Sequence, residues 1–83
     1  MFLHVIEARH VDGFTLWLRF NDGSEGEIDL TGELEGEVYG PLRALEQFCD
    51  FRVDEEIGTV VWSNGADLAP EFLRDNLRVA AVR

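Results

Sequence analysis

Residues 14 to 30, FTLWLRFNDGSEGEIDL, decide the fold of this chain. Every second side chain in the first seven is apolar: Phe14, Leu16, Leu18 and Phe20. The side chains between them would lie on the opposite face: Thr15, Trp17 and Arg19. This period of two predicts a β-strand with one face in the core.

The rest of the stretch predicts a hairpin. Asn21-Asp22-Gly23 is a turn sequence in which the glycine can adopt positive φ. Residues 24–30 then alternate again, with an inner set and an acidic outer set: Gly26, Ile28 and Leu30 inside, and Glu25, Glu27 and Asp29 outside. Upstream, residues 3–11 are rich in strand formers and end at Asp12-Gly13. We therefore expect a three-stranded antiparallel meander.

The second half predicts two short helices and another hairpin. Three glycines in residues 31–40 favour a loop. Pro41 suits the start of an amphipathic helix that ends near Cys49, with Leu42, Leu45 and either Phe48 or Cys49 inward. Residues 51–62 indicate a hairpin, and Pro70 begins a second helix that buries Phe72, Leu73 and Leu77. The tail from Arg78 to Arg83 suits a helix extension, an edge strand or a frayed end, and this choice stays open.

These elements predict an α+β fold: a small curved antiparallel sheet, made of a meander of three strands plus a hairpin, packed with two short helices. The length of 83 residues suits a single domain, residues 1–83.

The chain is strongly acidic, with a net charge of −10 and seven arginines as its only strong cations. The arginines are scattered, so we expect no direct nucleic-acid binding, which needs clustered cations. No apolar run approaches the ~20 residues of a membrane helix, and no secretory leader precedes the first strand. With a single cysteine, Cys49, these features predict a cytoplasmic protein without a membrane partner.

One part of the sequence resembles a known family. The order of LRFNDGSEGEIDL, GPLRALEQF and FRVDEEIGTVVWSNGADLAPEFL resembles the bacterial domain-of-unknown-function family 2442, from about Val5 to Leu77. The segment from Gly58 to Pro70 is its most specific part, and its family-motif positions are expected to be structural: Gly58, Trp62, Asn64, Gly65, Asp67 and Pro70.

The resemblance implies a compact α+β domain with a curved antiparallel sheet and no established catalytic residue. Some members carry a further C-terminal helix-turn-helix, and some are paired with another small protein in a toxin–antitoxin-like arrangement. The chain ends at Arg83, so we expect no appended helix-turn-helix here.

The segment after Trp62 has a structural explanation. Asn64-Gly65 suits a turn with positive φ. Because Ala69 is a poor helix cap, we expect Asp67 to accept backbone N–H bonds near Pro70. Trp62 is expected to be buried beneath the last helix.

No side-chain grouping predicts catalysis, a metal site or a cofactor. His4 and His10, six residues apart on one strand face, would be ~20 Å apart, too far to share a metal ion. Cys49, near a helix C-terminus, is expected to be half-buried and structural. The acidic strand has a spacing that a divalent cation could use, but a solvated face is the more common meaning.

The candidate interaction residues are therefore Trp17, Arg19, Glu25, Glu27 and Asp29. Trp17 would be an interface residue if its face is open and a core residue if a helix covers it; we favour the core position.

We expect a non-enzymatic protein-interaction module, the antitoxin-like member of a pair, that binds a small basic protein. The alternatives are a transcription-associated regulator related to longer family members, and a divalent-metal-binding protein. A homodimer is compatible with each.

Overall fold

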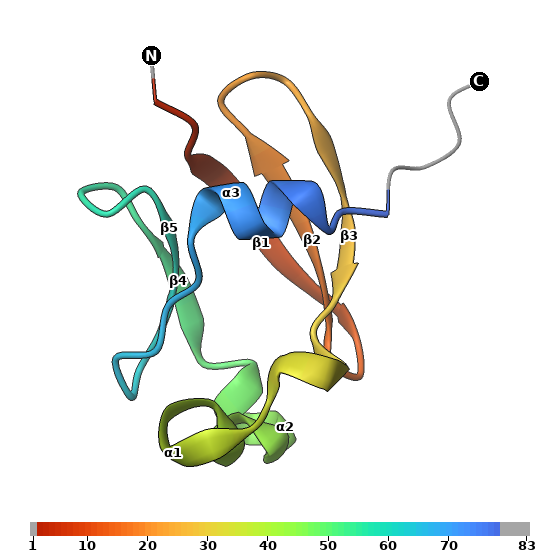
Figure 1. Cartoon of the computed structure of the whole chain (residues 1–83), viewed down its shortest axis with the longest axis vertical. Helices are drawn as coiled ribbons and strands as arrows, with labels where there is room; N and C mark the ends of the chain where they lie inside the picture. The colour runs from red at the N-terminus through yellow and green to blue at the C-terminus, as the bar shows by residue number, and fades with distance from the viewer. Residues whose placement is uncertain (1, 79–83) are drawn as a thin grey trace.

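The computed structural model describes residues 2–78 of the chain. Its first sheet is the predicted meander of β1 (Val5–Asp12), β2 (Thr15–Phe20) and β3 (Glu25–Asp29), in the order β1-β2-β3 with antiparallel neighbours (Figure 1). The alternating side chains of β2 and β3 follow the predicted faces, because the inner positions are buried and the outer acidic positions are exposed.

The hairpin of β4 (Phe51–Asp54) and β5 (Thr59–Trp62) forms a second sheet instead of extending the first. Within residues 2–78, one backbone hydrogen bond joins β1 to this hairpin, from the Val5 N–H to the Gly58 carbonyl oxygen at 2.9 Å. The α+β class with antiparallel strands is confirmed, and the two sheets are held together mainly by the core between them.

The predicted helix from Pro41 to Cys49 is wrong in its continuity. The connection contains η1 (Thr31–Glu33), α1 (Gly36–Tyr39), η2 (Gly40–Arg43) and α2 (Leu45–Phe48), all short. Ala44 is extended, with φ −75° and ψ 118°, and separates η2 from α2. The Arg43 side chain donates to the Leu34 carbonyl oxygen at 2.7 Å, which fixes the turn before the break.

This break changes which side chains are buried. Leu42 and Phe48 enter the core, but Leu45 is 47% exposed. Cys49, which caps α2, is exposed, and the expectation that it is half-buried is wrong. A single helix would have placed these side chains on one stripe, whereas the extended residue turns the second segment independently of the first.

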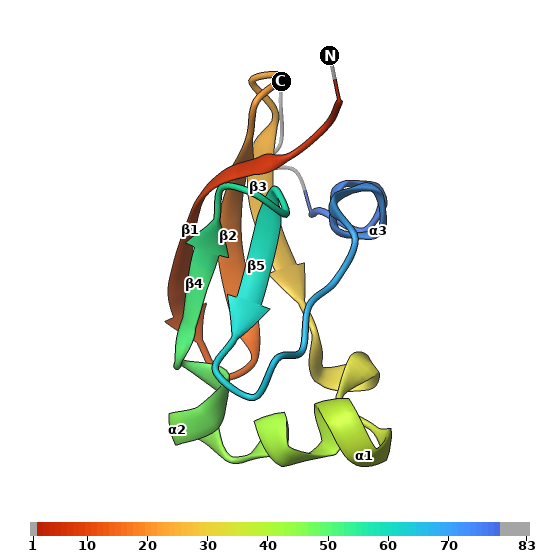
Figure 2. The same ribbon diagram turned by 90° about the vertical axis from the view of Figure 1, so that its left-hand side faces the viewer.

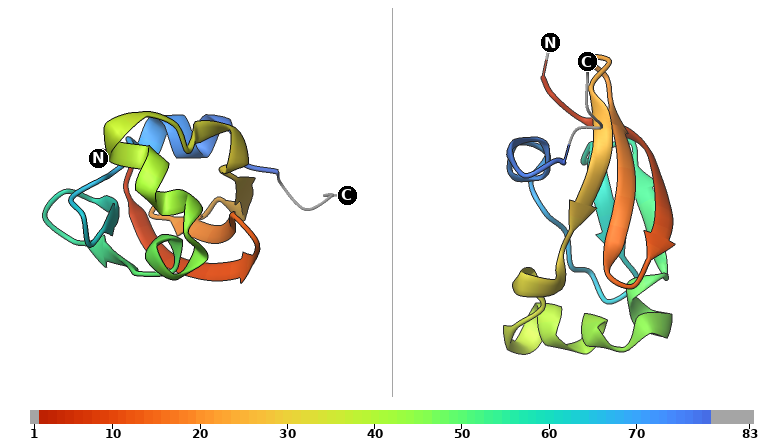
Figure 3. Two further views of the ribbon diagram at one scale, coloured as in Figure 1. Left: turned by 90° about the horizontal axis from the view of Figure 1, so that it is seen from below. Right: turned by 90° about the vertical axis from the view of Figure 1, so that its right-hand side faces the viewer.

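Helix α3 (Pro70–Asp75) begins at the predicted proline and lies on the inner side of the first sheet (Figure 2). It buries Leu73, with Phe72 packed at the edge of the core, as predicted. Leu77 also packs there, but it lies beyond the end of the helix, which is shorter than predicted. Seen from below, the two sheets and α3 surround the core (Figure 3). Its largest fully buried side chains are Trp62, Phe20, Phe48, Leu16, Leu18 and Ile28.

Of the C-terminal tail, residues 78–83, the structure describes only Arg78. Arg78 forms an antiparallel bridge with Glu27, with N–H···O distances of 2.6 and 3.2 Å. Residues 79–83 lie outside the described part of the chain.

Candidate functional site

The outer face of the first sheet holds the predicted interaction residues. Strand register aligns Arg9 with Trp17 and Trp17 with Glu27, so these three side chains form a row across β1, β2 and β3. The Arg9 guanidinium carbon lies 4.4 Å from the centre of the Trp17 ring, within the range of a cation–π contact. Antiparallel pairing, and not closeness in sequence, brings these residues together.

Trp17 is half-buried and lies on the face opposite α3, where Figure 3 shows no helix over the sheet. The favoured core position for Trp17 is therefore wrong. Its ring lines a hollow of about 480 Å³ on this face. The other residues that line the hollow are Arg9, His10, Val11, Glu25 and Glu27. An aromatic ring, a cation and two carboxylates thus surround one open depression.

A second row contains Glu7, Arg19 and Glu25. Arg19 donates to Glu7 at 2.7 Å, and Arg9 lies 3.6 Å from the same carboxylate. The arginines of β1 and β2 on this face, Arg9 and Arg19, are thus both paired with Glu7. Glu25 and Glu27 form no ion pair with any residue from 2 to 78, so the β3 side of the hollow is negative.

Asp29 extends the acidic strand but is already engaged. Its carboxylate accepts the Thr31 hydroxyl at 2.6 Å and the Thr31 N–H at 2.9 Å, and Arg78 lies 3.4 Å away. The two hydrogen bonds and the nearby guanidinium hold the pKa of Asp29 below its ordinary value. Within residues 2–78, no three His, Cys, Asp or Glu side chains gather to hold a metal ion. The acidic strand therefore offers single carboxylates, not a ligand cage.

The end of β5 and the loop after it have a structural role, as predicted for most of their residues. Trp62 is 1% exposed, and its indole N–H donates to the Phe48 carbonyl oxygen at 2.7 Å. Its ring packs against Phe48 and Phe51, so its aromatic neighbours come from α2 and β4, although the last helix was expected to cover it. Gly65 has φ +90°, as expected for the turn.

Asn64 stabilises this turn from both sides. Its side-chain oxygen accepts the Ala66 N–H at 3.0 Å, and its amide donates to the Val38 carbonyl oxygen at 3.0 Å. Both polar ends of this side chain are thus used within the fold.

The expected role of Asp67 is wrong. Helix α3 has no side-chain hydrogen bond at its N-terminus, and the Asp67 side chain is exposed. The backbone of this segment is held instead: Tyr39 donates to the Asp67 carbonyl oxygen at 2.7 Å, and Thr59 donates to the Leu68 carbonyl oxygen at 2.6 Å. Two hydroxyl groups from distant elements therefore position the chain before Pro70.

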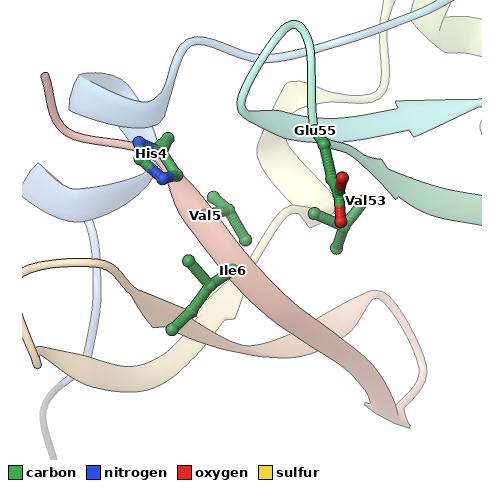
Figure 4. A pocket seen from close by; sticks show the side chains of 5 residues that line it. All are labelled: His4, Val5, Ile6, Val53 and Glu55. Atoms are coloured by element: carbon green, nitrogen blue, oxygen red, sulfur yellow. The ribbon is translucent and has the colours of Figure 1, made fainter.

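A second hollow, of about 390 Å³, lies where β1 and the hairpin diverge. Figure 4 shows His4, just before β1, and Val5 and Ile6 on β1 across from Val53 and Glu55 of the hairpin. The His4 ring faces a backbone acceptor, with its Nδ1 3.1 Å from the Phe2 carbonyl oxygen. This hollow brings together one carboxylate and mostly apolar side chains, so it offers fewer groups for binding a charged partner than the Trp17 hollow does.

The two histidines do not share a strand face. Irregular pairing between Val5 and Glu7 inserts one residue into β1, and such a bulge moves all later side chains to the opposite face. His10 pairs with the buried Leu16 position, and its ring packs on Phe48 at 6.1 Å. The prediction that the histidines hold no common metal ion does not depend on this correction.

Sequence comparison places this fold in a family. The model of a family described as a protein of unknown function (DUF2442) matches residues 5–78. The chain belongs to this family. No curated protein and no solved structure matches it. The family description assigns no activity, so any functional conclusion depends on the residues of this chain.

Within this DUF2442 domain, the segment that carries the resemblance supports the fold. The Gly58 carbonyl oxygen accepts from β1, the Trp62 indole donates to α2, and the Asn64 side chain in the turn donates to α1. In the described residues, no helix has the length and hydropathy needed to cross a membrane.

The sequence did not point to Arg9 or Glu7 as members of the site. The available signal was the pairing of the first two strands, which places Arg9 beside Trp17 once the register is known. The bulge between His10 and Asp12 shifts that register, so counting back from the Asp12-Gly13 turn would have misplaced Arg9.

Proposed function

We propose that the protein is a non-catalytic interaction module whose contact surface is the outer face of β1, β2 and β3. The observation that carries this proposal is the half-buried Trp17 on an uncovered sheet face, beside Glu25 and Glu27. Interface centres are enriched in aromatic residues and arginine, which matches the row of Arg9 and Trp17.

The charge of the chain supports a basic protein as the partner. A net charge of −10 attracts a cationic protein at long range and accelerates its association. Glu25 and Glu27 have no ion-pair partner among residues 2–78, so they can meet partner cations without breaking an ion pair of the described chain. A small acidic protein of this kind suits the neutralising, antitoxin-like member of a pair, and the exposed thiol of Cys49 suits a reducing cytoplasm.

Affinity capture with matched variants tests this proposal. The wild-type chain and two double variants, Glu25→Arg/Glu27→Arg and Glu33→Arg/Glu35→Arg, are used as baits in lysate of the native host. The two variants carry the same net charge, and all four glutamates are exposed. We expect a basic protein to be retained by the wild type and by the Glu33/Glu35 variant and lost by the Glu25/Glu27 variant.

The captured protein is then purified, and its affinity for the three chains is measured by calorimetry. Equal weakening by both double variants, or a partner that neither variant affects, contradicts the proposed surface. A folded Glu25/Glu27 variant, checked by circular dichroism, is required for the comparison.

A further inference from the structure

We propose that the Trp17 hollow receives an arginine or lysine side chain from a basic segment of a protein partner, and that Arg9 occupies this position in the free protein. This inference rests on the proposed function, because it concerns the same sheet face. It adds the chemistry of the contact and a competition between two cations for one aromatic ring.

The geometry of the row supports a cation seat. A guanidinium 4.4 Å from the ring centre satisfies the distance that cation–π contacts require. Glu27 lies directly across from Trp17 in the strand register, and Glu25 lines the same hollow. A cation over the β3 side of the ring can therefore contact an electron-rich face and approach both carboxylates, whereas Arg9 pairs with neither of them.

Arg9 can leave the ring without losing its counterion. Its guanidinium is also 3.6 Å from the Glu7 carboxylate, on the β1 side of the row, away from Glu25 and Glu27. The Arg9 side chain is 67% exposed, so its rearrangement costs little packing. A partner cation that displaces it gains the contacts with β3 that Arg9 does not make.

The size and charge of the hollow favour a side chain from a macromolecule. Its volume of about 480 Å³ is enough for one long side chain and part of a backbone. The hollow opens onto the outer face of the sheet. Residues on either side of the bound side chain in an extended segment can therefore also contact the sheet. Charge complementarity then selects a basic segment, because Glu25 and Glu27 have no ion-pair partner among residues 2–78.

Titration with defined peptides tests the seat directly. Hexa-arginine, hexa-lysine and a neutral glycine-serine hexapeptide are added to the purified chain at low ionic strength, and binding is followed by calorimetry and tryptophan emission. Trp62 is 1% exposed and acts as a constant background, so changes report Trp17. We expect saturable binding of the cationic peptides, with a changed Trp17 environment, and none of the neutral peptide.

Variants with equal net charge distinguish binding in the Trp17 hollow from general electrostatic attraction between the peptide and the acidic chain. Glu25→Gln/Glu27→Gln should weaken hexa-arginine binding about tenfold, equivalent to ~1.4 kcal/mol, whereas Glu33→Gln/Glu35→Gln should change it less than about twofold. Trp17→Leu should weaken binding without changing the net charge. Equal effects of the two glutamine pairs would overturn the proposal.

Arg9 provides the decisive comparison. Arg9→Ala should strengthen hexa-arginine binding several-fold more than Arg74→Ala, which removes one positive charge from α3 on the other side of the sheet. Equal gains would mean that Arg9 does not compete for the ring. If the peptides do not bind but the captured partner still requires Glu25 and Glu27, the cation seat fails and the proposed function stands.

Discussion

Gly58 and Gly65 both have positive φ, but their surroundings differ. The φ of Gly58 is +78°, and a Cβ added there would lie 2.7 Å from the Cβ of His4. The φ of Gly65 is +90°, and an added Cβ would meet no atom within 4 Å. Gly65 is thus required by its backbone conformation alone. Gly58 is required also by the close approach of the hairpin to the start of β1.

The alanine variants of these glycines should therefore lose different amounts of stability. Gly65→Ala should lower the free energy of unfolding by about 1 kcal/mol, the cost of a left-handed alanine. Gly58→Ala should lower it by about 2–4 kcal/mol, because steric overlap adds to that cost. Urea unfolding of both variants and the wild type measures the difference. Equal losses would show that His4 moves aside freely.

The elements that could be predicted from the sequence are those with strong local signals. The alternation in β2 and β3 and the Asn21-Asp22-Gly23 turn fix the meander, and Pro70 marks the start of α3. The broken helix could not be predicted, because the break at Ala44 accompanies a hydrogen bond from Arg43 to a residue nine positions earlier.

The candidate site was predictable in part for a similar reason. Strand alternation places Trp17, Glu25 and Glu27 on one face without any long-range information. The place of Arg9 depends on the bulge between His10 and Asp12, and the exposure of Trp17 depends on which face α3 covers. Neither follows from a local pattern.

Three strand-to-turn junctions are held by aspartates whose pKa values are lowered. Asp22 accepts from the hydroxyl and N–H of Ser24, and Asp29 does the same with Thr31. Asp54 accepts the N–H groups of Ile57 and Glu56. These hydrogen bonds, with nearby arginines, lower the three pKa values from the ordinary 3.8. The charged carboxylates therefore stabilise the turns.

Stability should fall in acid as these carboxylates are protonated. Because the folded-state pKa values are lowered, the stabilisation is complete above the ordinary pKa of 3.8 and is lost as the pH falls through the lower folded values. Urea unfolding at several pH values between about 5 and 2 measures this loss. Asp22→Asn/Asp29→Asn/Asp54→Asn should show a shallower decline over that range.

A second variant distinguishes the turns from general acid effects. Ser24→Ala/Thr31→Val keeps all three carboxylates but removes the hydroxyl donors that contribute most to the lowered pKa values of Asp22 and Asp29. It should also reduce the acid sensitivity. An unchanged pH profile in both variants would show that these turns do not control the acid response.

Repulsion among acidic groups opposes folding of the whole chain. The ion pairs within residues 2–78 use Glu7, Asp22, Asp29 and Asp54, whereas the sequence contains 17 acidic residues. Most carboxylates thus add to a net charge of −10 without a compensating contact in the described part of the chain. The same uncompensated carboxylates explain both the proposed partner surface and this repulsion. They keep negative charge available for a basic protein, and they also destabilise the free protein.

Added salt should therefore raise the melting temperature. Between about 0.01 M and 0.15 M NaCl the screening length falls from ~30 Å to ~8 Å, which weakens repulsion between distant carboxylates more than the short ion pairs. A gain of about 1 kcal/mol would raise Tm by ~4–8 °C in a chain of this size. Calorimetric melting at the two salt concentrations measures the change.

A triple variant serves as the control. Glu33→Gln/Glu35→Gln/Glu37→Gln, which removes three exposed charges, should show a smaller rise of Tm with salt. A Tm that falls with salt would show that the ion pairs, and not the repulsion, dominate the electrostatic free energy of folding.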